Sequence, residues 1–301
     1  MMTGLLSLLL SAAALTTPLE KRTYDLAVSG PKVLVGTEAG VVFWEWKDGT
    51  LDRTGVAVLP DSINTLTPVE GAVLASVGPE GVYRVDLTTR ESKLLADTRG
   101  AAMDALIVDG ALVVAEGTLG VGVYRDGAET GRIPTTGHCR GLAQMGSTLL
   151  AACGTDGVLR LDGKGKVLGR IETHGEARRL SVEGTRLAVA LGKAGTDLYD
   201  LKDAAKPVLL THIDSPDGAH DAELSGGLLV TADGKAGFHI YDVKDGSKAV
   251  VSGTIPTIYM ANRIRPLDGK LYLAEDGGGF RVMEWKKGAA VQLHPKEKAK
   301  P

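Results

Sequence analysis

The sequence predicts an all-β fold, a single seven-bladed β-propeller of four-stranded antiparallel blades. The chain repeats one pattern seven times, an apolar strand, a short turn, a glycine and an alternating strand, at intervals of 37 to 42 residues. A repeat of about forty residues made only of short strands is typical of a propeller with one blade per repeat. Glycine is abundant, at 40 of 301 residues, aromatic residues make up only 4%, and helical periodicity is almost absent.

The glycine of each repeat gives the alignment its register. The seven turn glycines are Gly40, Gly81, Gly120, Gly157, Gly195, Gly237 and Gly279. We expect each to adopt a positive φ in the turn between the second and third strands of its blade. None of them is interpreted as phosphate-binding, because no G-x-G-x-x-G stands between a strand and a helix.

The first strand of each blade is expected to line the central channel. Seventeen residues before the turn glycines stand Thr23, Asn64, Met103, Arg140, Arg178, His220 and Asn262. One residue further on stand Tyr24, Thr65, Asp104, Gly141, Arg179, Asp221 and Arg263. If this strand is innermost, both sets of side chains gather at one mouth of the channel, where propellers place their ligands.

The second and third strands differ in their patterns. Runs of four or five apolar residues precede the turn, as in LAVALGKAG at 187–195, and indicate a strand covered on both faces. After the turn, segments such as GVYRVDL at 81–87 alternate with a period of two, as a half-exposed third strand would. We expect the ring to close without strand exchange, with Trp44, Trp46 and Trp285 packed together where the first and last blades meet.

The repeat resembles the LVIVD repeat of secreted bacterial β-propellers. The hallmark is an alternating apolar strand that ends in Asp and is followed by a short run containing Pro, as in GTDLYDLKDAAKPVLLTHID at 195–214. Weaker versions are GFHIYDVKDGSKAVVSG at 237–253 and GVYRVDLTTRESKLLA at 81–96. The resemblance implies a propeller fold, an exported location and a binding or scaffold role, and it brings no catalytic motif.

Basic side chains gather in the predicted mouth. The cluster consists of His138, Arg140, His174, Arg178, Arg179, His220, Asp221, Asn262 and Arg263. Arginine suits carboxylate or phosphate, so the cluster predicts an anionic ligand, with Arg140, Arg178, Arg179, His220, Asp221, Asn262 and Arg263 as the ligand-binding residues. The alternative is that each arginine bridges an acid on the next blade, such as Glu176, Asp221 or Glu223.

The sequence offers two candidate metal sites. His138, His174 and His220 lie near Cys139, Asp217 and Asp221, but closely spaced ligand pairs are missing and the arginines would repel a cation. We therefore predict no cofactor and no transition-metal site. The weaker alternative is an axial Ca²⁺ of the kind found in propeller hydrolases and lactonases, held by Asn64, Asp104, Asp221 and Asn262.

The ends of the chain differ from the repeats. An apolar run from Leu5 to Leu15, with small residues around Ala14, fits a secretory signal, so we expect residues 1–22 to be signal peptide and leader, and the protein to be periplasmic or extracellular. We expect residues 23–294 to form the propeller and residues 295–301 to be a disordered tail. The run is too short to span a membrane, which takes about 20 residues.

The two cysteines, Cys139 and Cys153, lie in one repeat. A hairpin turning at Gly146 and Ser147 would pair position 140 with Cys153 and leave Cys139 facing the other way. A disulfide would need a bulge, and buried free thiols are the favoured interpretation.

These observations leave two classes of function open. The first is a non-enzymatic binding or scaffold propeller that engages a protein, a cell-envelope component or an anionic small molecule. The second is a metal-dependent hydrolase. A net charge of −3 and a pI near 6.1 argue against general nucleic-acid binding, which needs a basic face.

Overall fold

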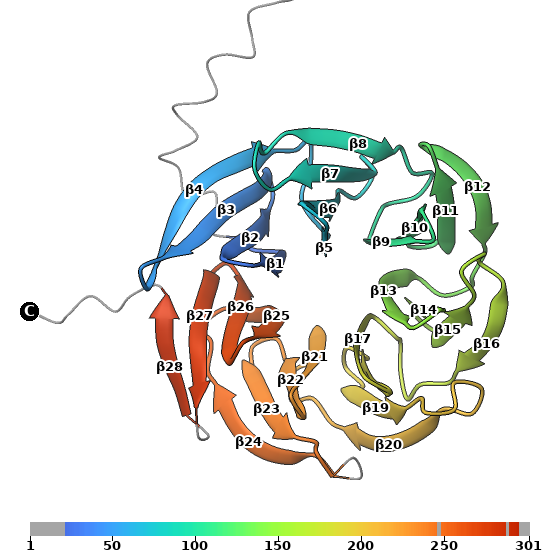
Figure 1. Cartoon of the computed structure of the whole chain (residues 1–301). Coiled ribbons are helices and arrows are strands. Elements are labelled where there is room, and N and C mark those ends of the chain that lie inside the picture. Colours follow the sequence, from blue (N-terminus) through green and yellow to red (C-terminus); the bar gives the residue numbers. More distant parts are fainter. Residues whose placement is uncertain (1–21, 246–247, 287–288, 295–301) are drawn as a thin grey trace, which may run out of the picture.

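The computed structural model describes residues 22–245, 248–286 and 289–294. Within them, all regular structure is strand, and seven four-stranded antiparallel sheets surround a central axis (Figure 1). This confirms the predicted seven-bladed all-β propeller. No helix of the described residues could cross a membrane. The expected signal segment, apart from its last residue, and the expected tail lie outside the described residues.

Each sheet is a meander of four consecutive strands that runs from the axis to the rim. The first blade contains β1 (Asp25–Ser29), β2 (Lys32–Thr37), β3 (Gly40–Lys47) and β4 (Thr50–Val58). The second contains β5 (Thr65–Val69), β6 (Ala72–Ser76), β7 (Val82–Asp86) and β8 (Ser92–Ala96). The third contains β9 (Asp104–Val108), β10 (Ala111–Ala115), β11 (Val121–Arg125) and β12 (Ala128–Ile133).

The remaining four blades continue around the ring. The fourth contains β13 (Cys139–Met145), β14 (Thr148–Cys153), β15 (Val158–Leu161) and β16 (Val167–Ile171). The fifth contains β17 (Arg179–Glu183), β18 (Arg186–Ala190), β19 (Thr196–Asp200) and β20 (Val208–Ile213). The sixth contains β21 (Asp221–Ser225), β22 (Leu228–Ala232), β23 (Phe238–Asp242) and β24 (Val250–Ile255). The seventh contains β25 (Met260–Leu267), β26 (Lys270–Asp276), β27 (Gly279–Lys286) and β28 (Ala289–His294).

The core lies between adjacent blades. The second strands β6 and β10 are buried along their whole length, as their continuous apolar runs predict. The turn glycine is required by the backbone at Gly81, where φ is 87° and an added Cβ would overlap the Ala96 carbonyl oxygen of the outer strand. All seven turn glycines have a positive φ, as expected.

The ring closes between the first and seventh blades. Each described sheet is built from four consecutive strands, which confirms the prediction that the blades exchange no strand. Within the part of the chain that the structure describes, an isolated antiparallel β-bridge pairs Arg22 with Asp276 across the junction. The Trp46 Nε1–H donates to the Tyr272 hydroxyl at 3.2 Å, so a tryptophan does pack at the closure. Trp285 packs instead against apolar residues between the sixth and seventh blades, which corrects the expectation that all three tryptophans meet.

Cys139 and Cys153 form a disulfide bond, so the interpretation as free thiols is wrong. The two residues are directly paired on β13 and β14, because the register shifts between Cys139 and Gly141 and leaves Arg140 as an extra residue. This is the bulge that the hairpin argument required for a disulfide.

The predicted register of the first blade is displaced by one residue. Asp25 pairs with Gly36, just as Thr65 pairs with Ser76 in the second blade, so Asp25 rather than Tyr24 occupies the predicted channel position. Gly36 stands four residues before the turn glycine of its blade, and Ser76 stands five before its own. Counting back from the glycine therefore missed Asp25 because the first turn is shorter.

Candidate ligand-binding site at the channel mouth

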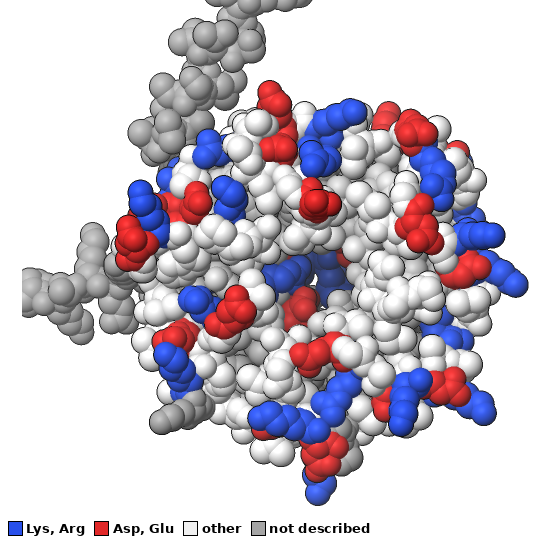
Figure 2. Space-filling model, viewed as in Figure 1, with Lys and Arg blue, Asp and Glu red and all other residues white. Residues whose placement is uncertain are grey.

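The first strands of the blades surround the channel, and their equivalent positions form a ring of side chains. We call this the axial ring: Asp25, Thr65, Asp104, Gly141, Arg179, Asp221 and Arg263. The residues just before it are called the entrance layer: Tyr24, Asn64, Met103, Arg140, Arg178, His220 and Asn262. Both signs of charge are visible inside the central opening (Figure 2).

The ring carboxylates join neighbouring blades. Asp25 accepts a hydrogen bond of 2.7 Å from the Leu66 amide of the second blade. Asp104 accepts one of 2.8 Å from the Leu142 amide of the fourth blade. Asp221 makes the equivalent contact with the seventh blade. These buried carboxylates are therefore inter-blade struts, which satisfy backbone N–H groups that would otherwise be unpaired.

Arg179 spans the channel from the fifth blade to the second. Its Nη1 donates to the Thr65 hydroxyl at 2.8 Å and its Nη2 to the Asn64 carbonyl oxygen at 3.3 Å. The same Nη1 lies 3.9 Å from Asp104. Burial raises the pKa of Asp104, and Arg179 opposes that shift. Arg179 thus braces the ring rather than facing free space.

Two arginines of β25 neutralise the acids on the other side of the ring. Arg263 Nε lies 3.6 Å from Asp25, and burial followed by Arg179 lowers the pKa of Arg263 to about 10. Arg265, two residues along, contacts Asp25 at 3.0 Å, Asp221 at 3.1 Å and Glu223 at 2.8 Å. Burial disfavours the Arg265 cation, but these carboxylates outweigh burial and raise its pKa. On this side of the ring the arginines therefore form ion pairs with acids of other blades, which is the alternative to ligand binding that the sequence left open.

The entrance layer differs, because the charges of its two arginines, Arg140 and Arg178, are poorly neutralised. The Arg140 Nε–H donates to His138 Nδ1 at 3.1 Å, and no ion pair joins Arg140 to a carboxylate among the described residues. Arg178 has one ion pair, at 3.6 Å, with the exposed Glu176, and its buried Nε has no hydrogen-bond partner within the described chain. An exposed pair of this kind contributes little, about 0–1 kcal/mol.

The pKa shifts in the entrance layer reflect crowded positive charge. Burial and the neighbouring Arg178 lower the pKa of Arg140. Burial and Arg140 lower the pKa of His138. Burial, then Arg263 and Arg178, lower the pKa of His220. Both imidazoles are therefore held toward the neutral form, in which each has an acceptor nitrogen.

The bulge in β13 has a second consequence. Arg140 is the extra residue between Cys139 and Gly141, and bulges commonly redirect a side chain next to a functional site. The disulfide fixes the strand at the same point. One irregularity of the backbone therefore allows the disulfide and also positions Arg140.

The residues of the Ca²⁺ alternative make structural contacts. Asn64 Nδ2 donates to the Ala102 carbonyl oxygen at 2.9 Å, and Asn262 Nδ2 to that of Tyr24 at 3.2 Å. Asp104 and Asp221 hold backbone amides and face arginines. The amide groups of both asparagines are thus used between blades, and a cation bound to the two aspartates would compete with guanidinium groups.

One predicted member of the cluster lies elsewhere. His174 contacts Asp197 of β19, the third strand of its blade, together with His212 of β20. Sequence reasoning missed both partners, because they belong to strands that the repeat pattern assigns to the rim. It also overlooked Arg265, although a period of two from Arg263 places it on the same face of β25.

Comparisons with known proteins agree with the fold. No protein-family model and no curated protein matches the chain. Among solved structures, the WD40 β-propeller domain of Doa1 superposes with a TM-score of 0.73 at 13% identity, over 88% of this chain and 94% of that one. The Neurospora crassa Pan2 WD40 domain gives 0.69 at 14% identity, over 90% and 91%. BamB from Moraxella catarrhalis gives 0.60 at 13% identity, over 87% and 84%. At these identities the likeness concerns architecture, and the chain has the seven-bladed β-propeller fold.

Proposed function

We propose that this protein is a non-enzymatic binding propeller that captures an anionic group of a partner at its channel mouth. The observation that carries the proposal is Arg140, a half-buried guanidinium without an ion-pair partner among the described residues. A carboxylate or phosphate placed between Arg140 and Arg178 would relieve their mutual repulsion and satisfy the unpaired Arg178 Nε.

The surroundings of these two arginines support the proposal. The residues of the entrance layer include no acid, and the acids of the axial ring below are occupied by Arg179, Arg263 and Arg265. The nearby carboxylate is that of the exposed Glu176, which pairs with Arg178 and also attracts Arg140. The ion pairs of the axial ring hold the blades together and do not involve the two half-buried entrance arginines, Arg140 and Arg178. A concave mouth with low-dielectric walls concentrates the field of its charges, so an anion gains more there than on an open surface.

The proposal extends to the class of partner and the location. The partner is a protein or cell-envelope component that presents an acidic or phosphorylated group, and a small anion is the minimal ligand. We propose an exported, LVIVD-type propeller, supported by the apolar leader pattern at 5–15 and by the disulfide, since disulfides persist in oxidising compartments.

Calorimetric titration of the purified chain with citrate and with inorganic phosphate tests the proposal. We expect one site, and a loss of affinity of about 10-fold or more for Arg140→Gln and for Arg178→Gln, since a charged hydrogen bond contributes about 1.5–3 kcal/mol. The control is Arg125→Gln, whose exposed side chain donates to the Asp109 carbonyl oxygen, away from the entrance layer. Equal affinity in all three variants would overturn the proposal.

A further inference from the structure

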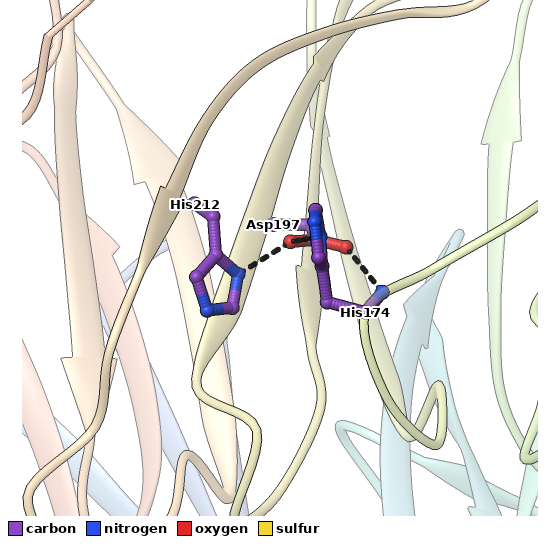
Figure 3. A group of neighbouring side chains, drawn as sticks. All are labelled: His174, Asp197 and His212. Carbon is purple, nitrogen blue, oxygen red and sulfur yellow. Dashed lines mark hydrogen bonds and ion pairs between the residues drawn. The ribbon is translucent and has the colours of Figure 1, made fainter.

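A cluster of two imidazoles and a carboxylate lies on the fifth blade (Figure 3). His174 Nδ1 lies 2.8 Å and His212 Nδ1 2.7 Å from the same Asp197 oxygen, Oδ1. Asp197 is fully buried, while His174 and His212 are 50% and 28% exposed, so solvent reaches the rings but not the carboxylate. Among the described residues, this is the single group of three metal-ligating side chains whose donor atoms converge within 4.8 Å.

Comparison with the other blades shows what is unusual here. An acid anchors the loop before the blade in the third and fourth blades too, where Glu116 and Asp156 accept loop N–H groups. In those blades the outer strand supplies an arginine to the acid, Arg132 and Arg170. The strand pairings place His212 at the same position as these two arginines.

At this position of the outer strand the fifth blade therefore has an imidazole, His212, in place of a guanidinium, and the loop adds a second imidazole, His174. A guanidinium stays protonated and has no lone pair to offer, whereas a neutral imidazole is the commonest metal ligand in proteins. Anchoring the loop does not require this exchange, because in the third and fourth blades the acid anchors the loop with an arginine as its partner. The exchange of arginine for histidine at position 212 therefore needs an explanation other than loop anchoring.

Asp197 is positioned to serve as the third ligand. Its Oδ2 accepts the His174 backbone N–H at 3.0 Å and the Tyr199 hydroxyl at 3.0 Å. These bonds fix the carboxylate and leave Oδ1 for the two rings. The three donor atoms come from three segments: His174 Nδ1 from the loop before β17, Asp197 Oδ1 from β19 and His212 Nδ1 from β20. The antiparallel pairing of Asp197 with His212 holds β19 and β20 together.

The surroundings match those of a metal centre with an open position. His212 Nε2 lies 3.5 Å from a carboxylate oxygen of Asp214, the type of outer partner that orients a ligating imidazole. A pocket of about 450 Å³ borders His174 and Tyr199 and gives room for a water or an outside ligand. Arg170 also lines this pocket, and its charge is paired with Asp156 at 3.1 Å.

We propose that His174, Asp197 and His212 bind a divalent transition-metal ion of the Zn²⁺ type, with a fourth position open to the pocket. Without metal, each Nδ1–H donates to Asp197 Oδ1. With metal, each neutral ring carries its proton on Nε2 and presents the Nδ1 lone pair, so the net charge of the rings is unchanged. The His212 Nε2–H then points to Asp214. Two imidazoles and one carboxylate are a ligand set known for such ions. The site is separate from the anion-binding mouth and does not depend on it.

Zn²⁺ alone is the probe for the test. The purified full chain is stripped with chelator and titrated with Zn²⁺ by calorimetry. We expect one ion per chain, and for His174→Ala a loss of affinity at least as large as the 10- to 100-fold typical of outer-shell changes. Asp214→Asn should weaken binding by about 10-fold. Co²⁺ in place of Zn²⁺ should give the visible absorption of a four- or five-coordinate ion with nitrogen ligands.

His212→Arg is the decisive variant, since it recreates the acid–arginine pair of the third and fourth blades. We expect it to keep the wild-type circular dichroism and melting temperature and to lose the Zn²⁺ site. His239→Gln is the matched control, because His239 also pairs with a buried acid, Asp233, but among the described residues no second imidazole converges with it on that acid. The proposal is overturned if the wild-type chain binds no stoichiometric Zn²⁺, or if His174→Ala and His212→Arg bind it as tightly as the control.

Discussion

Arg179 Nη1 donates a hydrogen bond of 2.8 Å to the Thr65 hydroxyl, which joins the fifth blade to the second across the central channel. The two residues are 114 positions apart and occupy equivalent places in their repeats. Contacts between neighbouring blades hold the ring locally, whereas this bond links opposite sides of it. Arg179 is therefore better understood as a structural residue than as a ligand.

Arg179→Ala should lower the free energy of unfolding by about 1.5–3 kcal/mol, because it removes a charged hydrogen bond and the cation that lies 3.9 Å from Asp104. Urea unfolding of Arg179→Ala, Thr65→Val and the double variant measures the coupling. We expect the double variant to lose clearly less than the sum of the single losses. Strict additivity would mean that the bond across the channel contributes nothing to stability.

Arg265→Ala should be the more damaging change. It would leave the carboxylates of Asp25 and Asp221 with Arg263 as their remaining close cation on β25, and loss of one partner of a buried ion pair costs about 3–5 kcal/mol. The measurement is the urea midpoint, with Arg125→Ala as a surface control. A loss as small as that of the control would contradict the role of Arg265 as a neutralising strut.

The lowered pKa of Asp156 predicts how the stability of the protein depends on pH. Burial favours its neutral form, but hydrogen bonds from Gly137 and Thr136 and the charge of Arg170 outweigh burial and lower its pKa below 3.8. Its contribution to stability is thus fully present above about pH 3.8 and is lost as the pH falls through the lower, folded-state pKa. Melting curves should show Asp156→Asn well below the wild type at pH 7, with the gap narrowing below pH 3.8. A gap that is constant with pH would rule out this linkage.

The disulfide predicts the state of both thiols. Protein purified under oxidising conditions and denatured without reductant should show no reactive thiol, and two after reduction. Replacing Cys139 and Cys153 with Ala should cost about 2–4 kcal/mol, because the link closes a short loop in the unfolded chain. Thiol titration and urea unfolding check both statements. Two reactive thiols before reduction would show that the cysteines are free.

The repeat pattern was sufficient to predict the fold, since turn glycines and buried second strands depend on local chemistry that each repeat preserves. It failed for Asp25 because the turn before Gly40 is one residue shorter than the turn before Gly81, so counting back from Gly40 gives Tyr24 instead of Asp25. It failed for the disulfide because a bulge at Arg140 leaves no local signal.

The candidate site was only partly predictable for a different reason. The sequence placed Arg140, Arg178 and Arg263 at one mouth, but whether each arginine is neutralised depends on carboxylates from other blades. His212 was missed because its partners are 15 and 38 residues away and meet only through the pairing of β19 with β20.

The most direct test of the proposed anion site is a crystal structure of the protein soaked with selenate, with the anion located by its anomalous signal. The account predicts a peak at the entrance layer, within hydrogen-bonding distance of both Arg140 and Arg178, that is absent from the Arg140→Gln crystal. Anomalous peaks confined to the outer strands, or a carboxylate of the protein itself paired with Arg140, would contradict it.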